Sequence, residues 1–461
     1  MDAEKFWSRS SVAFDDPMLE ECYYAAMHGK RCLLKAGKTP PGLFFPSALK
    51  DFSLWHGDYH LNYNYQSIFL GDYESNHVEQ GDAYFTGVGP LLKLGEKISR
   101  RYYGISGGCF VQLCGYPFES EDDYFGSLPL GRMAYMTGWV AAYFHRRFLL
   151  TKDIAFLREK TYPVLRRIAT FYAGFLKPDG QGVYHAFPSN QGEADFSRDG
   201  ALDQPQVVYH AAYALHCAAS SAETLGIDSE ERTAWKCILA HLPRKFDDMP
   251  KGMAPEFFSF DGQRPKPGQR PDFLTPGNRF HDWYFGQVPY KISIALHCNA
   301  WQREEHYQPL IDCLKRWHQP NGLSRAMSVA THGFVGPWTE SLGIAGALIN
   351  MLMTSDGGVI RVFPGIPDGR RAAFSSLRAE GAFLVSAQKN GTTAWIDVAA
   401  EADGTCRICN PWENCRILKD GRSQTSSDRI IELVLAKGAH CLLADAGPAV
   451  ARATRHSAAL A

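Results

Sequence analysis

The sequence has almost no excess of charge of either sign. Its 461 residues include 48 Lys and Arg against 49 Asp and Glu, which gives a formal net charge of -1. Proteins that bind nucleic acid or anionic membranes usually carry a basic excess, so this balance gives no reason to expect either partner. A neutral substrate fits the charge balance better.

Long hydrophobic runs are also lacking. No run approaches the roughly 20 apolar residues that a membrane-spanning helix needs. The N-terminal residues Met1–Lys5 carry acidic side chains and are not followed by the apolar segment of a signal peptide. We therefore expect a soluble protein, cytoplasmic as the sequence is written, with no membrane partner. The sequence makes no prediction about its oligomeric state.

Cysteine pairs with the spacing of a metal site are lacking as well. The sequence has 12 cysteines, but the pair Cys406 and Cys409, with Cys415 nearby, has no second pair at the spacing of a zinc site. We expect these three residues to be small apolar side chains on β-strands. We expect neither a metal nor an organic cofactor.

Helical periodicity dominates the chain up to about residue 355. Apolar residues recur at three- and four-residue steps over 132–148, 163–176, 206–225 and 342–352. Long loops at 104–130 and 243–283 are rich in Gly, Pro and aromatic residues, and loops of this length are usually functional. Antiparallel helix pairs with such loops at one end fit an α/α toroid, in which the loops of one rim form a sugar-sized cleft.

The periodicity changes after Asp356-Gly357-Gly358. Short runs with the composition of strands follow at 359–363, 382–387, 393–398, 406–410 and 430–433. Asn390-Gly391 and Asp420-Gly421 have the sequence of hairpin turns. We predict a mainly α protein: an (α/α)6 barrel over 1–356, a small antiparallel β domain over 357–447 and a disordered tail over 448–461.

Polar and aromatic residues are concentrated between Trp55 and Gln66. Asn62 and Asn64 are two residues apart, so in an extended segment both carboxamides would face one side and could hold one water or one substrate hydroxyl. A turn stabilised by Asn side chains explains the same residues. The other candidates for substrate binding here are Trp55, His56, Asp58, Tyr59 and His60.

Two carboxylates and one histidine complete the candidate residues. Glu193 ends the loop 187–193, where partial burial would raise its pKa and make it a proton donor, although a solvated Glu is the alternative. Glu340 follows Trp338 just before the 342–352 helix, whose N-terminus would keep it ionised or be capped by it. His281, beside Asp282 and Trp283, is either a ligand for a sugar hydroxyl or a buried core residue.

These segments, in this order, resemble the catalytic region of glycoside hydrolase family 95, the inverting α-L-fucosidases. The run Tyr59–Asn64 is similar to the family's Tyr-x-x-Asn-x-Asn motif, and 188–193 is similar to its Pro-Ser loop that ends in a catalytic Glu. The run 343–360 resembles the last barrel helix and the entry to the β domain. The resemblance covers about residues 17–400 and lacks the family's usual N-terminal β-sandwich.

The resemblance implies single-displacement hydrolysis of a terminal α-linked sugar by an α-L-fucosidase- or α-L-galactosidase-like enzyme. Glu193 would be the general acid, and Asn62 and Asn64 would hold the attacking water. Glu340 stands about where the family has an Asp that activates these Asn residues. The family's His-x-x-His loop reads Phe280-His281-Asp282-Trp283 here, a departure that leaves the identity of the sugar open.

Two alternatives remain open. The first is another α/α-barrel carbohydrate enzyme: a polysaccharide lyase, for which Tyr59 and His60 are candidate bases, or a sugar phosphorylase, for which no phosphate site is evident. The second is a barrel that binds glycans without catalysis. In each case the partner is an oligosaccharide or glycan.

Overall fold

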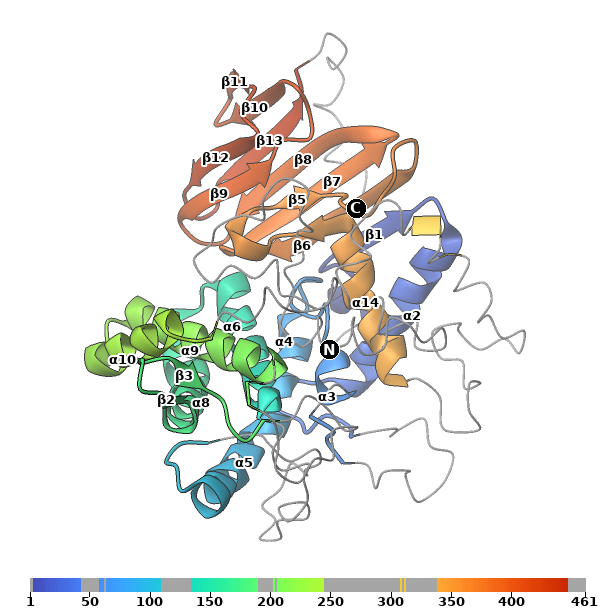
Figure 1. Cartoon of the computed structure of the whole chain (residues 1–461). Coiled ribbons are helices and arrows are strands. Elements are labelled where there is room, and N and C mark those ends of the chain that lie inside the picture. Colours follow the sequence, from blue (N-terminus) through green and yellow to red (C-terminus); the bar gives the residue numbers. More distant parts are fainter. Residues whose placement is uncertain are drawn as a thin grey trace, which may run out of the picture.

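The computed structural model describes residues 3–42, 58–61, 64–108, 134–189, 202–203, 205–243, 307–308, 311 and 338–446. Helices occupy most of the described chain before residue 353, and an antiparallel sheet follows (Figure 1). This confirms the prediction of a mainly helical protein with a C-terminal antiparallel sheet. The predicted loops at 109–130 and 244–283, which make up most of the two long loops, lie outside the described residues.

The described helices agree closely with the periodicity of the sequence. Predicted helices at 132–148, 163–176, 206–225 and 342–352 correspond to α6, α8, α9 and α14. The α-helices are α1 Ala3–Trp7, α2 Pro17–Leu33, α3 Asn64–Ser67, α4 Val78–Gly81, α5 Ala83–Ile98, α6 Tyr135–Thr151, α7 Ile154–Phe156, α8 Tyr162–Phe175, α9 Pro205–Leu225, α10 Ser229–Ala240 and α14 Trp338–Leu352. Single turns of other helix types are η2 Ser99–Tyr103, η4 Leu157–Thr161 and η8 Asp356–Gly358.

Asp228 directly precedes α10, but its side chain does not cap the helix. Its backbone is left-handed (φ 50°), and its side chain makes no capping hydrogen bond. The carboxylate instead accepts a hydrogen bond from the hydroxyl of Tyr162 at 2.6 Å and pairs with Nε of Arg166 at 2.7 Å. Asp228 therefore fastens α8 to the start of α10.

One hydrophobic core joins α5, α6, α8, α9 and α10, and it also includes the aromatic residues of the 59–73 segment. The helices approach closely where glycine permits it. A Cβ on Gly138 of α6 would lie 2.2 Å from the carbonyl oxygen of His210 on α9. The α6–α9 contact therefore depends on the missing side chain.

The strands form one large sheet and three pairs. The large sheet has the order β1-β6-β7-β8-β13-β10-β11, and β12-β9, β2-β3 and β4-β5 form the pairs. The bounds are β1 Ser11–Phe14, β2 Lys177–Pro178, β3 Tyr184–His185, β4 Met353–Thr354, β5 Arg361–Val362, β6 Arg371–Ala379, β7 Phe383–Asn390, β8 Thr392–Ala400, β9 Gly404–Cys409, β10 Cys415–Lys419, β11 Arg422–Ser426, β12 Ile430–Leu435 and β13 His440–Asp445.

Two hairpins of the sheet turn where the sequence predicts. Asn390-Gly391 connects β7 to β8, and Asp420-Gly421 connects β10 to β11 with positive φ at both residues (51° and 71°), as a type I′ turn requires. Cys406 and Cys415 are buried on β9 and β10, in agreement with their expected role as apolar strand residues. The strands β6, β10, β11 and β13 were not predicted.

The strand β1 was not predicted either, and it crosses the predicted boundary between domains. It pairs antiparallel with β6, with Ser11 opposite Ser375 and Phe14 opposite Ala372. A second hydrophobic core contains side chains of α1, α2, α14 and the sheet together. In Figure 1, α2 and α14 lie side by side beneath the sheet. The core of the sheet thus draws on both sides of residue 356.

A polar seam, made of Glu74, Asn76, Arg146, Arg378 and Glu380, joins the helices to the sheet. Arg146 on α6 donates to Glu74 and to Glu380, each at 2.8 Å. Arg378 on β6 donates to Oδ1 of Asn76 at 2.6 Å, and its backbone N–H donates to the carbonyl of Glu74 at 2.8 Å. The seam fixes residues 74–76 against both regions.

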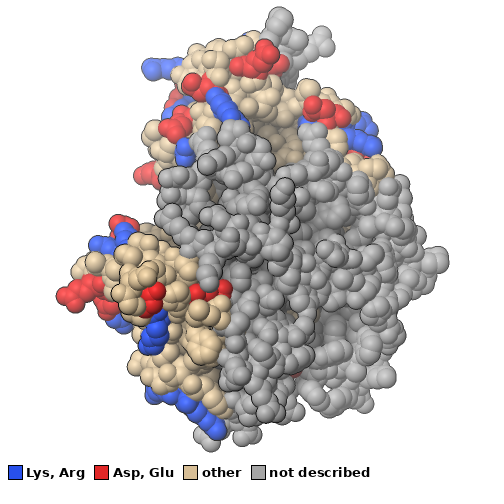
Figure 2. Space-filling view, viewed as in Figure 1, with Lys and Arg blue, Asp and Glu red and all other residues tan. Residues whose placement is uncertain are grey.

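Neither the described helices nor the face shown in Figure 2 suggests a membrane or a polyanion as partner. No helix among the described residues is long and apolar enough to cross a membrane. On the face shown in Figure 2, acidic and basic side chains are interspersed over the part that the structure describes. This distribution agrees with the net charge of -1.

Candidate functional site

The candidate site segment, which comprises the described residues from 58 to 80, begins with a buried acid–histidine pair. Asp58 and His60 are 4% and 5% exposed, and a carboxylate oxygen of Asp58 forms a short hydrogen bond with Nδ1 of His60. A carboxylate at Nδ1 accepts a hydrogen bond from the N–H of that nitrogen, which leaves Nε2 as the atom presented on the other side of the ring. The pair can therefore hold the imidazole in one orientation.

Tyr59, between these two residues, faces the core. Its side chain is 1% exposed, and its ring lies 4.4 Å from that of Tyr65. Its hydroxyl donates to the carbonyl of Pro40 at 2.5 Å, and burial raises the pKa of this hydroxyl. Contact of Tyr59 with a substrate stays a prediction.

Asn64 is half-buried and is the first residue of the short helix α3. The sequence-based argument for two Asn side chains on one side assumed an extended segment. That assumption is wrong at Asn64, because the backbone turns there: the hydroxyl of Ser67 donates to the carbonyl of Asn64 at 3.1 Å. Asn62 lies outside the described residues, so its relation to Asn64 stays a prediction.

Gln66, two residues after Asn64, is a polar residue that the sequence analysis did not select. It is 2% exposed, and its Nε2 donates to the carbonyl of Leu61 at 2.5 Å. Its Oε1 is buried and has no hydrogen-bond partner among the residues that the structure describes. A buried acceptor of this kind usually has a partner, and its place at the end of the polar and aromatic run 55–66 was the signal that could have found it.

Lys30 on α2 holds the chain that follows α3. Its side chain is fully buried, and Nζ donates to the carbonyls of Ile68 and Leu70 at 2.9 and 2.8 Å and to Oδ1 of Asp72 at 3.1 Å. Burial lowers the pKa of Lys30 and raises that of Asp72 to about 7, while each group's charge opposes the shift of the other. We call Lys30, Asp72 and the two carbonyls the Lys30 anchor.

The helix α14 packs on the same turn through two glycines. A Cβ on Gly346 would lie 2.9 Å from the carbonyl carbon of Leu70, and one on Gly71 would lie 2.7 Å from Cα of Gly346. Gly71 also has a positive φ of 88°. Leu342, nearer the start of α14, belongs to the same core as Tyr59. The N-terminal half of α14 therefore lies against the candidate site segment.

This packing bears on Glu340 and Trp338, which are in the first turn of α14. A carboxylate in the first turn of a helix is stabilised in its ionised form. The side chains of both residues lie outside the described part of the structure. Their convergence with Asn64 stays a prediction.

Asp203 closes the base of the loop that carries Glu193. Its two carboxylate oxygens accept from the backbone N–H of Ala186 at 2.8 Å and bond Nδ1 of His185 at 2.6 Å. Its own N–H donates to the carbonyl of Ala186 at 2.9 Å. The proximity of Asp203 is the main reason that the pKa of His185 is raised. Both ends of the loop are thus tied together, although residues 190–201 are not described.

Several predicted site residues cannot be placed in this geometry. Trp55, His56, Asn62, Glu193, His281, Asp282 and Trp283 lie outside the described residues. Of the others, the structure pairs Asp58 with His60, and Tyr59 and Asn64 are their neighbours in the sequence. Sequence reasoning missed Lys30, Asp72 and Asp203, because the partners of each are distant in the chain.

Comparison with known proteins places the site segment in a recognised catalytic domain. Residues 48–270 match the family model "Glycosyl hydrolase family 95 catalytic domain". The chain carries a glycoside hydrolase catalytic region. The match covers somewhat less than half of the chain and includes Asn62, Asn64 and Glu193, whereas Glu340 and the C-terminal sheet lie beyond it. It confirms the resemblance that the sequence motifs predicted.

One sequence relative and one solved structure are also similar to this chain. A kojibiose hydrolase from Mucilaginibacter mallensis is 30% identical over 154 residues, which are 32% of this chain and only 22% of that relative. A solved structure described as "Putative kojibiose phosphorylase from human microbiome" is 10% identical and aligns with a TM-score of 0.52, over 94% of this chain and 68% of its own. The second likeness shows a shared fold.

Proposed function

We propose that this chain is an inverting glycoside hydrolase that removes terminal α-linked sugars from an oligosaccharide. The observation that carries the proposal is the family 95 match over 48–270, because it contains the three residues given chemical roles by the sequence motifs. We further propose that the helices up to residue 356 form an (α/α)6 barrel, followed by a β domain over 357–447.

In this mechanism Glu193 protonates the leaving oxygen while a water attacks from the opposite face of the sugar. Asn62 and Asn64 hold the water, and Glu340 polarises it. Inverting enzymes keep about 6.5–9.5 Å between their two catalytic groups to leave room for that water. Two features support the proposal: Asp203 fixes the base of the Glu193 loop, and α14, which carries Glu340, packs on the turn after Asn64.

The sugar is chosen by the residues around this centre. We propose Trp55, His56, Asp58, Tyr59, His60, His281, Asp282, Trp283 and Trp338 as substrate contacts. The name of the Mucilaginibacter relative adds an α-linked glucose disaccharide, kojibiose, to α-L-fucosides and α-L-galactosides as candidate substrates. Release of free sugar from these three glycosides, compared side by side, selects among them.

A product assay separates the proposal from its alternatives. A hydrolase releases reducing sugar in phosphate-free buffer, whereas a phosphorylase requires phosphate and releases a sugar phosphate. A lyase acting on a uronic-acid polymer produces an unsaturated product that absorbs in the ultraviolet. Release of no product from any of these substrates, together with glycan binding, would support the non-catalytic alternative.

Replacement of Glu193 tests the proposed acid. In Glu193→Gln the shape is kept and the proton is lost, so we expect a fall in kcat of about 10²–10⁴-fold for a natural disaccharide. An activated aryl glycoside should lose much less, because its leaving group needs no proton. Equal losses for the two substrates would indicate that Glu193 positions the sugar, and unchanged rates for both would remove it from the mechanism.

A further inference from the structure

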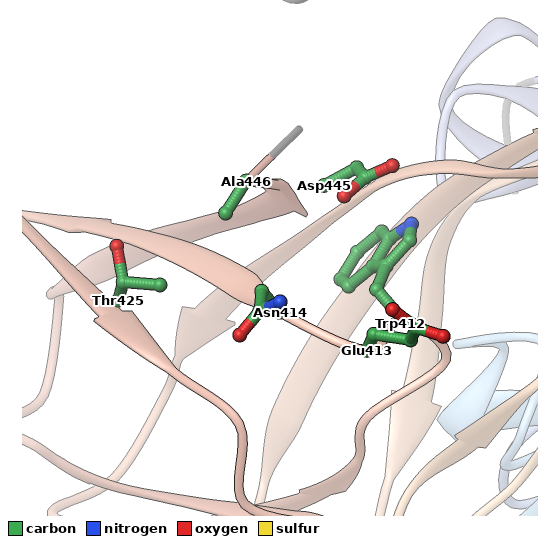
Figure 3. A pocket seen from close by; sticks show the side chains of 6 residues that line it. All are labelled: Trp412, Glu413, Asn414, Thr425, Asp445 and Ala446. Carbon is green, nitrogen blue, oxygen red and sulfur yellow. The ribbon is translucent and has the colours of Figure 1, made fainter. Parts of the chain in front are cut away.

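A pocket lies at one end of the large sheet, outside every residue given a role in hydrolysis. Three strands end there together, since Cys415 at the start of β10 lies opposite both Ser426 of β11 and Asp445 of β13. The pocket has a volume of about 560 Å³. The residues that line it are Trp412, Glu413, Asn414, Thr425, Asp445 and Ala446 (Figure 3).

The aromatic wall of the pocket is held in place by the protein itself. The indole Nε1 of Trp412 donates to the carbonyl of Thr393 on β8 at 2.8 Å, and the backbone N–H of Trp412 donates to Oδ1 of Asn410 at 3.0 Å. The side chain is half-buried. In Figure 3 the ring stands on one side of the pocket and Thr425 on the other. A ring fixed in this way loses little conformational freedom when a ligand binds.

Apart from Ala446, the rest of the lining is polar, and none of the lining residues is basic. Glu413 and Asp445 provide carboxylates, Asn414 provides an amide that can both donate and accept, and Thr425 provides a hydroxyl. The floor is closed by a backbone hydrogen bond of 2.9 Å from Ala446 to the carbonyl of Asn414. Two carboxylates without a basic residue in the lining disfavour an anionic ligand, such as a phosphate or a uronate.

We propose that this pocket is a second carbohydrate-binding site that takes a neutral pyranose of a glycan. The apolar face of the sugar ring lies on Trp412, and its hydroxyls bond to the carboxylates, Asn414 and Thr425. An amide and a hydroxyl match the mixed donors and acceptors of a sugar. The choice of ligand class rests on the proposed hydrolase function, but the site shares no residue with that mechanism.

Binding at this site can be measured separately from catalysis through the indole N–H signals in nuclear magnetic resonance spectra. The full chain in Glu193→Gln form, which is expected to turn over little substrate, is titrated with kojibiose and with methyl α-L-fucopyranoside. Spectra of Trp412→Ala and Trp395→Ala assign the two signals. Trp395 is the matched control: it is also half-buried in the sheet, and its Nε1 donates to Gln388 at 3.0 Å, but it does not line the pocket.

We expect at least one sugar to shift the Trp412 signal saturably while the Trp395 signal stays in place. The double variant Asn414→Ala/Thr425→Val should weaken this binding by roughly tenfold, since it removes two hydrogen-bonding groups while keeping the ring. Its folding is checked by the unchanged position of the Trp395 signal. An unchanged affinity in the double variant would overturn the proposal.

Three other results would also overturn it. The first is a Trp412 signal that neither sugar moves at concentrations of tens of millimolar. The second is an equal shift of both indole signals, which would indicate a general effect of the sugar. The third is a Trp412 shift that tetramethylammonium causes, that high salt abolishes and that neither sugar produces. The pocket would then bind a cation, held by the carboxylates against the Trp412 ring. If the wild-type chain hydrolysed none of the glycosides but sugars still shifted the Trp412 signal, the proposed function would be contradicted and this site would not.

Discussion

The candidate site segment and the C-terminal sheet bury very different side chains. Within the described residues from 58 to 80, nine polar or charged side chains are buried, whereas only two are buried between 371 and 445, namely Arg378 and Lys389. The sheet is filled instead by aliphatic residues, Phe and Cys. The nine residues are Asp58, His60, Gln66, Ser67, Asp72, Ser75, Asn76, His77 and Gln80.

Burial of polar groups costs free energy unless each is hydrogen-bonded, so the site segment is expected to gain less stability from burial than the apolar core of the sheet. Three acceptors of these nine residues, Oε1 of Gln66, Oδ2 of Asp72 and Oε1 of Gln80, have no hydrogen-bond partner in the described part of the chain. What such a network provides is a fixed backbone geometry. Departures from the simplest stable packing are expected at functional positions, and here they surround Asn64. Matched substitutions in the two regions test this contrast.

The largest effect is expected from removal of the Lys30 anchor. In Lys30→Met the carboxylate of Asp72 stays buried without its partner, so the free energy of unfolding should fall by about 3–5 kcal/mol. The control is Lys389→Met in the sheet. Lys389 is also buried and donates to the carbonyl of Ile366 at 2.9 Å, but its charged partner Asp368 has a side chain that is 81% exposed, so water replaces the lost ion pair. There we expect about 1–2 kcal/mol, mainly from the carbonyl that loses its donor. Urea denaturation measures both, and equal losses would remove the contrast.

A smaller effect is expected from Gly346→Ala. The new Cβ would meet backbone atoms of Leu70 and Gly71 at 2.9–3.0 Å, so α14 must move away from the turn after α3. We expect a loss of up to about 3 kcal/mol in stability, and a fall in kcat that exceeds any change in KM. Gly404→Ala in β9 is the control.

A Cβ on Gly404 would touch only the ring of Phe383, at an ordinary 3.6 Å. Its stability should therefore change by no more than about 0.5 kcal/mol. If Gly346→Ala changed stability as little as Gly404→Ala, the close approach of α14 to the site segment would contribute nothing measurable to stability.

The smallest of the three effects concerns acid. Burial lowers the pKa of His77 to about 4, so the folded chain holds this ring neutral where the unfolded chain, with an ordinary pKa near 6.5, takes up a proton. Stability is therefore complete above pH 6.5 and falls as the pH drops towards 4, by about 2 kcal/mol at pH 5. Asp72, with its raised pKa, acts in the opposite sense over this range.

The contribution of His77 is therefore read from the difference between wild type and His77→Asn. The free energy of unfolding, measured by urea denaturation, should fall less between pH 8 and pH 5 in the variant than in the wild type. The expected difference between the two falls is about 2 kcal/mol. His440→Asn is the control, because the side chain of His440 on β13 is 67% exposed. A variant that kept the full acid sensitivity of the wild type would show that His77 is not its source.

The sequence predicted local features well and long-range ones poorly. The helices α6, α8, α9 and α14 and the Asn390-Gly391 and Asp420-Gly421 turns follow from periodicity and turn chemistry, which depend on neighbouring residues. The strand β6 was missed because Arg371–Ala379 is rich in Ala and Ser, which are weak strand formers.

For the site, the sequence indicated the segment but not what holds it. Lys30 could have been noticed as a charge on the apolar face of α2, three residues after Met27 and seven after Tyr23. Its partner Asp72 is 42 residues away, and no local pattern joins the two. Asp203, 17 residues from Ala186, escaped notice for the same reason.

The pairing of β1 with β6 has a consequence for the time course of synthesis. Ser11 and its neighbour Ser375 are 364 residues apart, so a ribosome working at about 5–20 residues per second makes β6 roughly 20–70 seconds after β1. During that interval β1 has no strand to pair with, and an unpaired strand is prone to join another chain. In the folded protein Ser11 and Ala13 are exposed and alternate with buried Val12 and Phe14. Before β6 is made, β1 therefore has large apolar side chains on one side only, which makes association with another chain less favourable.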